Sequence, residues 1–157
     1  MKGRLIALVL MTMALWQGCD TIDCTLENTV SYTCNFYSEG KKITLNDALT
    51  ITACGTDSVL LNNMQGAQSI QLPMSYWNDV DTLVMNVTGN EYALHDTLFI
   101  AKTNTPHYES PDCPTNMFHE ITSVRCTHTF LDSITITQAL VNYDKVENIQ
   151  IHFTPAK

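Results

Sequence analysis

The chain has 157 residues, of which 16 are acidic and 8 are Lys or Arg, so its formal net charge is −8 at pH 7. This balance argues against a nucleic-acid-binding protein, because phosphate contacts need clustered basic side chains and only Lys41 and Lys42 are adjacent. A chain of this length can bury a substantial core as one domain.

The first segment of the chain has the pattern of an export signal. It begins MKGR, with two positive charges, and continues as an apolar run over residues 5–16 that only Thr12 interrupts. A positive start followed by such a run is typical of a secretory signal, and the run is shorter than the roughly 20 residues of a transmembrane helix. We therefore expect residues 1–18 to be a signal peptide that is removed.

The residue after the expected cut is Cys19, and Gly18 precedes it. A small residue directly before a cysteine resembles the lipobox of bacterial lipoproteins, in which that cysteine is acylated. The family pattern has Leu three places before the cysteine, where this chain has Trp16. An ordinary secretory cut is the alternative, but it prefers small residues at both flanking positions and fits this stretch less well. We expect Cys19 to carry acyl chains that anchor the protein stably.

Export would place the remaining cysteines in an oxidising compartment, where disulfides form. Removing residues 1–18 takes away two positive charges and no acidic residue, so the net charge falls from −8 to −10. Five thiols remain, enough for at most two disulfides, and the residue pattern alone leaves their pairing open. They are Cys24, Cys34, Cys54, Cys113 and Cys126.

After a short tether at residues 19–28, the chain has the pattern of strands separated by turns. Apolar and polar residues alternate over 48–53, 69–74, 133–137 and 148–153. Further strands are predicted at 30–37, 58–62, 82–87, 97–103 and 118–124. Pro73 should lie at an edge strand or a bulge. We predict an all-β fold in which residues 29–157 form a single antiparallel β-sandwich, immunoglobulin-like in the first instance, with a small barrel as the alternative.

A tripeptide of Asp, then Ser or Thr, then an aliphatic residue recurs along the chain. It begins at five of the ten aspartates, namely Asp20, Asp57, Asp81, Asp96 and Asp132. One interpretation is structural, since Asp closes a turn and a β-branched residue then opens a strand. The other is that the tripeptide resembles the O-glycosylation sequon of exported Bacteroidota proteins. Its candidate acceptors are Thr21, Ser58, Thr82, Thr97 and Ser133.

The segment 106–134 contains three of the five histidines and two cysteines. Cys126 and His128 would share one strand face, and His107 and His119 would approach from neighbouring segments to complete a zinc site. The spacings match no standard zinc pattern. A disulfide-bonded cysteine with backbone-bonded histidines is therefore the competing interpretation.

Catalytic motifs do not stand out in the sequence. His119 and Glu120 begin like the metalloprotease motif H-E-x-x-H, but Ser123 occupies the position of the second histidine. The stretch NDVD, with Asp79 and Asp81, lacks the Gly and the distal Glu of a calcium loop. We expect no enzymatic activity and no cofactor.

Five segments together resemble a family of uncharacterised lipoproteins from gut Bacteroidota that carries a domain-of-unknown-function label. They are TIDCTLENTV (21–30), LPMSYWNDVDTL (72–83), KTNTPHYESPDC (102–113), FHEITSVRCTHTFLDSI (118–134) and NYDKVENIQIHF (142–153). The resemblance implies an envelope location and a β-sandwich-like fold, but no activity. Two cysteines that recur in the family match Cys24 and Cys113, which implies a disulfide between them. Cys34 and Cys54 would form a second bridge if adjacent strands place them face to face.

These features lead us to expect a non-enzymatic lipoprotein of the cell envelope, at the outer membrane. Its partners would be the membrane, through the lipid anchor, and an envelope protein or a glycan. Exposed aromatic residues such as Tyr76, Trp77 and Tyr108 are candidate contact residues, because Tyr and Trp are enriched in binding surfaces. The alternative function is a metal-binding protein built on the histidines and cysteine of segment 106–134.

Overall fold

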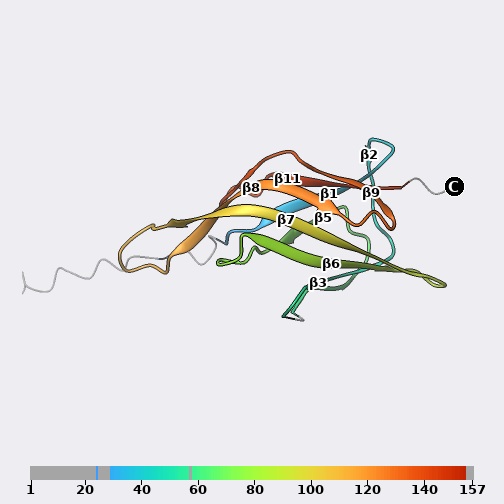
Figure 1. The fold of residues 1–157 in the computed structure, drawn as a ribbon, viewed down its shortest axis with the longest axis horizontal. Coiled ribbons are helices and arrows are strands. Elements are labelled where there is room, and N and C mark those ends of the chain that lie inside the picture. The colour runs from blue at the N-terminus through green and yellow to red at the C-terminus, as the bar shows by residue number, and fades with distance from the viewer. Residues whose placement is uncertain (1–23, 25–28, 57, 155–157) are drawn as a thin grey trace, which may run out of the picture.

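A computed structural model describes Cys24, residues 29–56 and residues 58–154. The predicted signal peptide, Cys19 and Thr21 lie outside the described residues. Within them the chain forms eleven strands and no helix (Figure 1), as the all-β prediction expected. The strands are β1 (Tyr32–Ser38), β2 (Lys41–Lys42), β3 (Ala48–Ala53), β4 (Val59–Met64), β5 (Ser69–Leu72), β6 (Val80–Thr88), β7 (Ala93–His107), β8 (Asn116–Cys126), β9 (Leu131–Ile136), β10 (Leu140–Val141) and β11 (Glu147–Phe153).

The strands form two sheets. One has the order β2-β1-β11-β9, with β5 also paired to β1, and the other has the order β10-β8-β7-β6-β3-β4. All strand pairs are antiparallel except β1 and β11, which run in parallel. The prediction of antiparallel strands throughout is therefore wrong for this pair. Most of the chain lies between these two strands, so no tight turn imposes an antiparallel direction on them.

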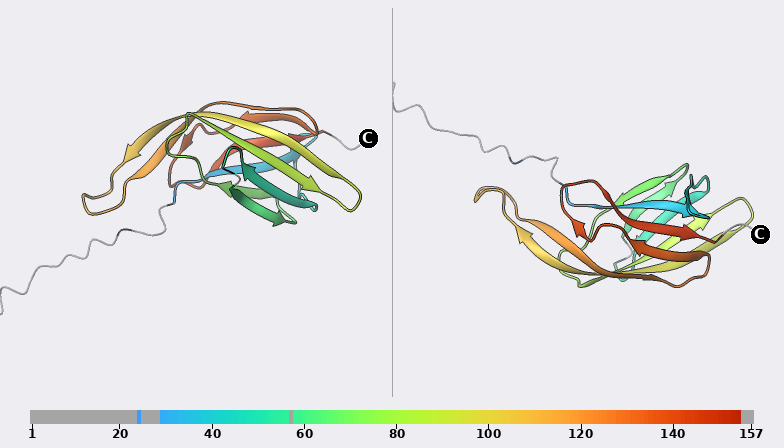
Figure 2. Two further views of the ribbon diagram at one scale, coloured as in Figure 1. Left: turned by 60° about the horizontal axis from the view of Figure 1, so that its bottom comes forward. Right: turned by 90° about the horizontal axis from the view of Figure 1, so that it is seen from above.

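The two sheets share one hydrophobic core (Figure 2), which follows from the alternation of apolar residues along their strands. On β6 the side chains of Leu83 and Met85 are buried while their neighbours are partly exposed, and β7 repeats this pattern. Phe36 on β1 and Ile151 on β11 enter the same core from the other sheet. Each such side chain stabilises the fold by about 1.5–3 kcal/mol on full burial.

The predicted strands all occur, and the range 48–53 coincides with β3. The largest difference is β7, which extends the predicted 97–103 to Ala93–His107. Polar residues at its end hide the strand in the sequence, but main-chain pairing with β8 continues as far as His107 and Asn116. Pro73 directly follows β5, which pairs only with β1 and is an edge strand, as expected.

The hairpin of β7 and β8 projects beyond the rest of the six-stranded sheet. Pairing between β6 and β7 ends at Val80 and Ala101, whereas β7 and β8 remain paired for six further residues of β7. We call residues 102–121 the arm, and residues 108–115 its tip. The arm points to the left in Figure 1. Cys24 is joined by a disulfide to Cys113 in the tip, with 5.6 Å between their Cα atoms.

In the part of the chain that the structure describes, there is no helix long and apolar enough to cross a membrane.

Candidate functional site

The base of the arm contains a buried lysine. Lys102 follows Leu98 and Ile100 on the inward face of β7, at a position where the alternation places a core residue. Burial of an ammonium group without partners would be strongly unfavourable, so Lys102 must have hydrogen-bond acceptors and a counterion inside the protein.

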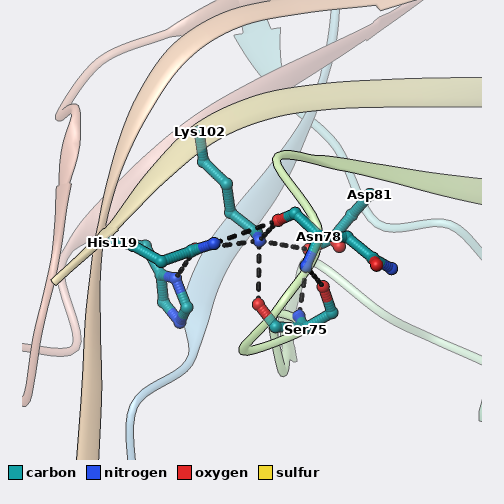
Figure 3. A network of polar contacts seen from close by, with 6 residues as sticks. Ser75, Asn78, Asp81, Lys102 and His119 are labelled. Carbon is teal, nitrogen blue, oxygen red and sulfur yellow. Dashed lines mark hydrogen bonds and ion pairs between the residues drawn. The ribbon is translucent and has the colours of Figure 1, made fainter. Parts of the chain in front are cut away.

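All three hydrogens of the Lys102 ammonium group have acceptors (Figure 3). The Nζ atom donates to the backbone carbonyl of Ser75 at 2.8 Å, to the backbone carbonyl of Asn78, and to Oδ1 of Asn104 at 3.0 Å. Its counterion is Asp81, whose Oδ2 lies 3.6 Å away. Burial lowers the pKa of Lys102, and the Asp81 carboxylate opposes that shift. The lysine therefore acts as a fixed three-point donor inside the protein.

The Lys102 ammonium group holds the connection between β5 and β6, residues 73–79, which we call the aromatic loop. The loop is also closed from within, since the N–H of Ser75 donates to Asp81 Oδ2 and the N–H of Asn78 donates to Ser75 Oγ, both at 3.1 Å. Between the two carbonyls that Lys102 binds lie Tyr76 and Trp77. The Trp77 side chain is 86% exposed, which is unusual for so large an apolar group.

His119 on β8 completes the buried network. Its side chain is 1% exposed, and Nδ1 lies 2.7 Å from Asn104 Oδ1. Because that oxygen is an acceptor, Nδ1 carries the hydrogen and Nε2 has a lone pair that no described residue satisfies. Burial, and then the charge of Lys102, lower the pKa of His119 to about 4, so its ring is neutral at pH 7. The ring of Tyr76 lies 6.4 Å from that of His119, which links the arm to the aromatic loop.

A pocket of about 290 Å³ opens beside the aromatic loop. Ser75, Asn78 and Asp81 form part of its wall, so the residues that bind Lys102 also face the pocket. Cys54 and Leu60 also line it. The volume is at the lower end of the range for small-molecule sites. The pocket and the exposed Trp77 side chain occur on the same stretch of chain, which makes this the candidate functional site.

Comparison with protein families identifies a match over residues 48–153, to a family of unknown function, DUF6452. The chain belongs to this family. No curated protein matches the chain, and no solved structure matches it. The DUF6452 match includes the aromatic loop, Lys102 and His119. It begins at β3, although β1 precedes it and pairs with β11 in the core of the same domain.

The DUF6452 fold does not bring the four predicted metal ligands together. His107 stacks on Phe118 with 4.1 Å between the ring centres, while His119 faces inward. Cys126 and His128 touch each other at 3.5 Å, but Cys126 lies seven residues along β8 from His119, or about 23 Å. Among the described residues no group of three or more His, Cys, Asp or Glu could hold a metal ion. The predicted four-residue metal site is therefore not formed.

The contact between Cys126 and His128 also does not make a nucleophile. Burial raises the pKa of the Cys126 thiol; a hydrogen bond from the His128 backbone opposes that shift, and the carboxylates of Asp96 and Asp132 add to it. His128 donates from Nδ1 to the backbone carbonyl of Asp132 at 2.8 Å. A reactive cysteine needs a stabilised thiolate, and this environment favours the thiol.

Of the two predicted disulfides in this DUF6452 chain, the structure contains one. Cys24 is bonded to Cys113, the pair that the family resemblance implied. The predicted bridge between Cys34 and Cys54 is wrong, and both thiols are free. Cys34 is buried on β1 of one sheet, whereas Cys54 is exposed at the end of β3 in the other, so they never face each other across adjacent strands.

The recurring tripeptide has a structural role at two of its positions. Asp96 is 0% exposed and accepts hydrogen bonds from the N–H groups of residues 129–131, and Asp81 binds Lys102. Of the predicted glycosylation acceptors, Ser58 is exposed, whereas Thr82, Thr97 and Ser133 are half-buried. O-glycosylation remains a prediction, and Ser58 is the most accessible described acceptor.

Lys102, the residue that organises the site, was not predicted from the sequence. An isolated lysine after TLFIA looks like the solvent-facing end of a strand. The signal that would have identified it is the two-residue repeat of the strand. Leu98, Ile100 and Lys102 are every second residue, so all three lie on the same buried face.

Proposed function

We propose that this protein is an exported, lipid-anchored protein of the cell envelope, and that its domain is a non-enzymatic binding or accessory module. The anchor is supported by the signal-like residues 1–18, by Cys19 behind Gly18, and by the resemblance to lipoproteins of gut Bacteroidota. The binding role is supported by one observation above all: a buried lysine fixes the loop that exposes Trp77.

The free-energy balance explains why that observation favours binding. Desolvating Lys102 and Asp81 costs several kcal/mol, which their attraction only partly returns. What the pair achieves is a loop whose conformation is set before any partner arrives. A loop whose backbone is already fixed loses little backbone conformational entropy on binding, and Trp is among the residue types enriched at binding hot spots.

The same geometry favours a non-enzymatic role. The Lys102 side chain is fully buried and its three hydrogens are donated within the protein, so it presents no free amine to a substrate. The buried Cys126 thiol stays protonated, as described above.

The binding role is tested with Trp77→Ala in the mature domain, probed against glycan arrays and against crosslinked native envelopes. The matched control is Tyr92→Ala, at an aromatic residue that is 47% exposed on a different turn. The variant at Trp77 should lose partners that the wild type and the control both retain. Equal retention by both variants, with both folded, would contradict the proposal.

The lipid anchor is tested by intact mass spectrometry of the protein from native membranes. A terminus at Cys19 with the added mass of acyl chains supports it. An initiating Met, or an unmodified Cys19, rules it out. The same spectra report sugar additions, for which Ser58 is the first residue to substitute.

We also propose that the fold is a β-sandwich. Two sheets that share a core support a β-sandwich. Immunoglobulin constant domains divide seven strands into sheets of four and three. Here β6, β7 and β8 are consecutive neighbours in a six-stranded sheet, which is a different order. An experimental structure compared strand by strand with that order is the test.

A further inference from the structure

We infer that the Cys24–Cys113 disulfide makes the arm the membrane-proximal end of the protein, with Tyr108 in the tip contacting the membrane interface. This inference rests on the proposed acylation of Cys19. It goes beyond anchoring, because a lipid attached at Cys19 does not by itself set which end of the domain faces the membrane.

The chain between the anchor and the bridge is short. Cys19 and Cys24 are five residues apart, a distance of at most about 18 Å even when fully extended. The disulfide adds 5.6 Å between Cα atoms, so Cys113 lies within about 24 Å of the acylated residue. Without the bridge, the first residue held in a sheet would be Tyr32, at up to about 47 Å from the anchor.

The arm forms one end of an elongated domain (Figure 1). β7 has 15 residues and is about 50 Å long, with the arm at one end and the turn that contains Tyr92 at the other. The arm tip projects beyond the remaining strands in all views (Figures 1 and 2), so the body of the domain does not shield it from a surface. The bridge therefore holds a protruding end, and not a flat side, close to the anchor.

The tip of the arm carries an exposed aromatic residue and acidic residues. Tyr108 is 69% exposed, and its amphipathic ring suits the headgroup region of a bilayer, where Tyr and Trp concentrate. Glu109 and Asp112 follow this position in the sequence and carry negative charge. The partner surface that fits this chemistry is therefore a zwitterionic one, since anionic headgroups would repel the tip.

The test uses tryptophan as a depth probe in the full lipidated protein. Trp77 is the only Trp after residue 18, so Trp77→Phe gives a background in which Tyr108→Trp and Tyr92→Trp can be compared. Each protein is placed in phosphatidylcholine vesicles that contain brominated phosphatidylcholine, which quenches nearby indole rings. We expect a large loss of fluorescence with Trp at position 108 and little loss at position 92. Replacing Cys24 and Cys113 together by Ser should abolish that difference, with strand content checked by circular dichroism.

The outcomes separate this inference from the proposed function. Equal quenching at both positions in a protein that floats with the vesicles would overturn the inference and leave the lipid anchor intact. A difference that survives removal of both cysteines would also overturn it, since the bridge would then not set the orientation. A protein that does not float and has an unmodified Cys19 would overturn the proposed anchor, and this inference with it.

Discussion

Two copies of the same tripeptide, Asp-Thr-Leu, lie on neighbouring strands and do different things. Asp81 begins the copy on β6 and Asp96 the copy on β7, and both carboxylates are buried. Asp96 accepts hydrogen bonds from the backbone of residues 129–131 and from the Thr127 hydroxyl, with no cation beside it in the described structure. Asp81 accepts from one backbone N–H, pairs with Lys102 and faces the pocket.

The difference shows how one sequence pattern serves two purposes. Main-chain donors and the Thr127 hydroxyl together satisfy Asp96, so it closes the turn between β8 and β9 and leaves no acceptor for a ligand. Asp81 has fewer main-chain donors and needs a lysine from the next strand, and that lysine extends its hold to the aromatic loop. The less enclosed carboxylate is the one around which a pocket and an exposed Trp77 are built.

The largest expected effect on stability comes from removing Lys102, the cation that pairs with Asp81. Lys102→Met leaves the carboxylate buried without its partner and frees the carbonyls of Ser75 and Asn78. Breaking a buried ion pair in this way costs about 3–5 kcal/mol, which urea unfolding measures. Lys145→Met, at an exposed lysine, is the control and should change little. A loss below about 1 kcal/mol would mean that the Asp81 carboxylate does not depend on Lys102 for compensation of its charge.

The next effect is expected at the other copy. Asp96→Asn places an amide against several N–H donors and should cost about 3 kcal/mol. Asp132→Asn, in an exposed copy of the tripeptide, is the matched control. The hydrogen bonds lower the pKa of Asp96 despite its burial, so its contribution is present above the ordinary pKa of about 3.8 and is lost as pH falls below that value. A similar loss in both variants would remove the distinction between the copies.

A smaller effect should appear in the pH dependence of the free energy of unfolding, through His119 in the network around Lys102. The folded protein holds His119 neutral down to a pKa of about 4, whereas the unfolded chain binds a proton near 6.5. The unfolded state therefore binds more protons between these values, and stability should fall by about 2.6 kcal/mol as pH drops from 6.5 to 4. His119→Asn keeps a donor to Asn104 without titrating, so the difference between variant and wild type isolates this group. Parallel curves would contradict the assignment.

The smallest effect on stability is expected at Trp77. Its side chain is almost fully exposed, so Trp77→Ala should change the free energy of unfolding by no more than about 0.5 kcal/mol. A much larger loss would indicate that the indole is part of the fold and not a free contact surface. This measurement therefore shows whether the Trp77 side chain is free to contact a partner or packs against the rest of the protein.

What could be predicted from the sequence was governed by local alternation. β3 and β6 have clear apolar faces and appear where expected, whereas β2 and β10 have two residues each and carry no periodic signal. The parallel pairing of β1 with β11 depends on residues more than 100 positions apart, which no local pattern encodes. The aromatic loop was anticipated only as exposed residues, because its fixed shape depends on Lys102 from a distant strand.

The central claim is that Lys102 fixes the aromatic loop, and amide hydrogen exchange tests it most directly. In the wild type the N–H groups of Ser75 and Asn78 should exchange slowly, because both are hydrogen-bonded within the held loop. In Lys102→Met these two amides should lose more protection than Leu98 in the core of β7, whose exchange should speed up only by the factor that the measured loss of global stability predicts. If Ser75 and Asn78 exchange equally fast in both proteins, the lysine does not set the conformation of the loop and the account is contradicted.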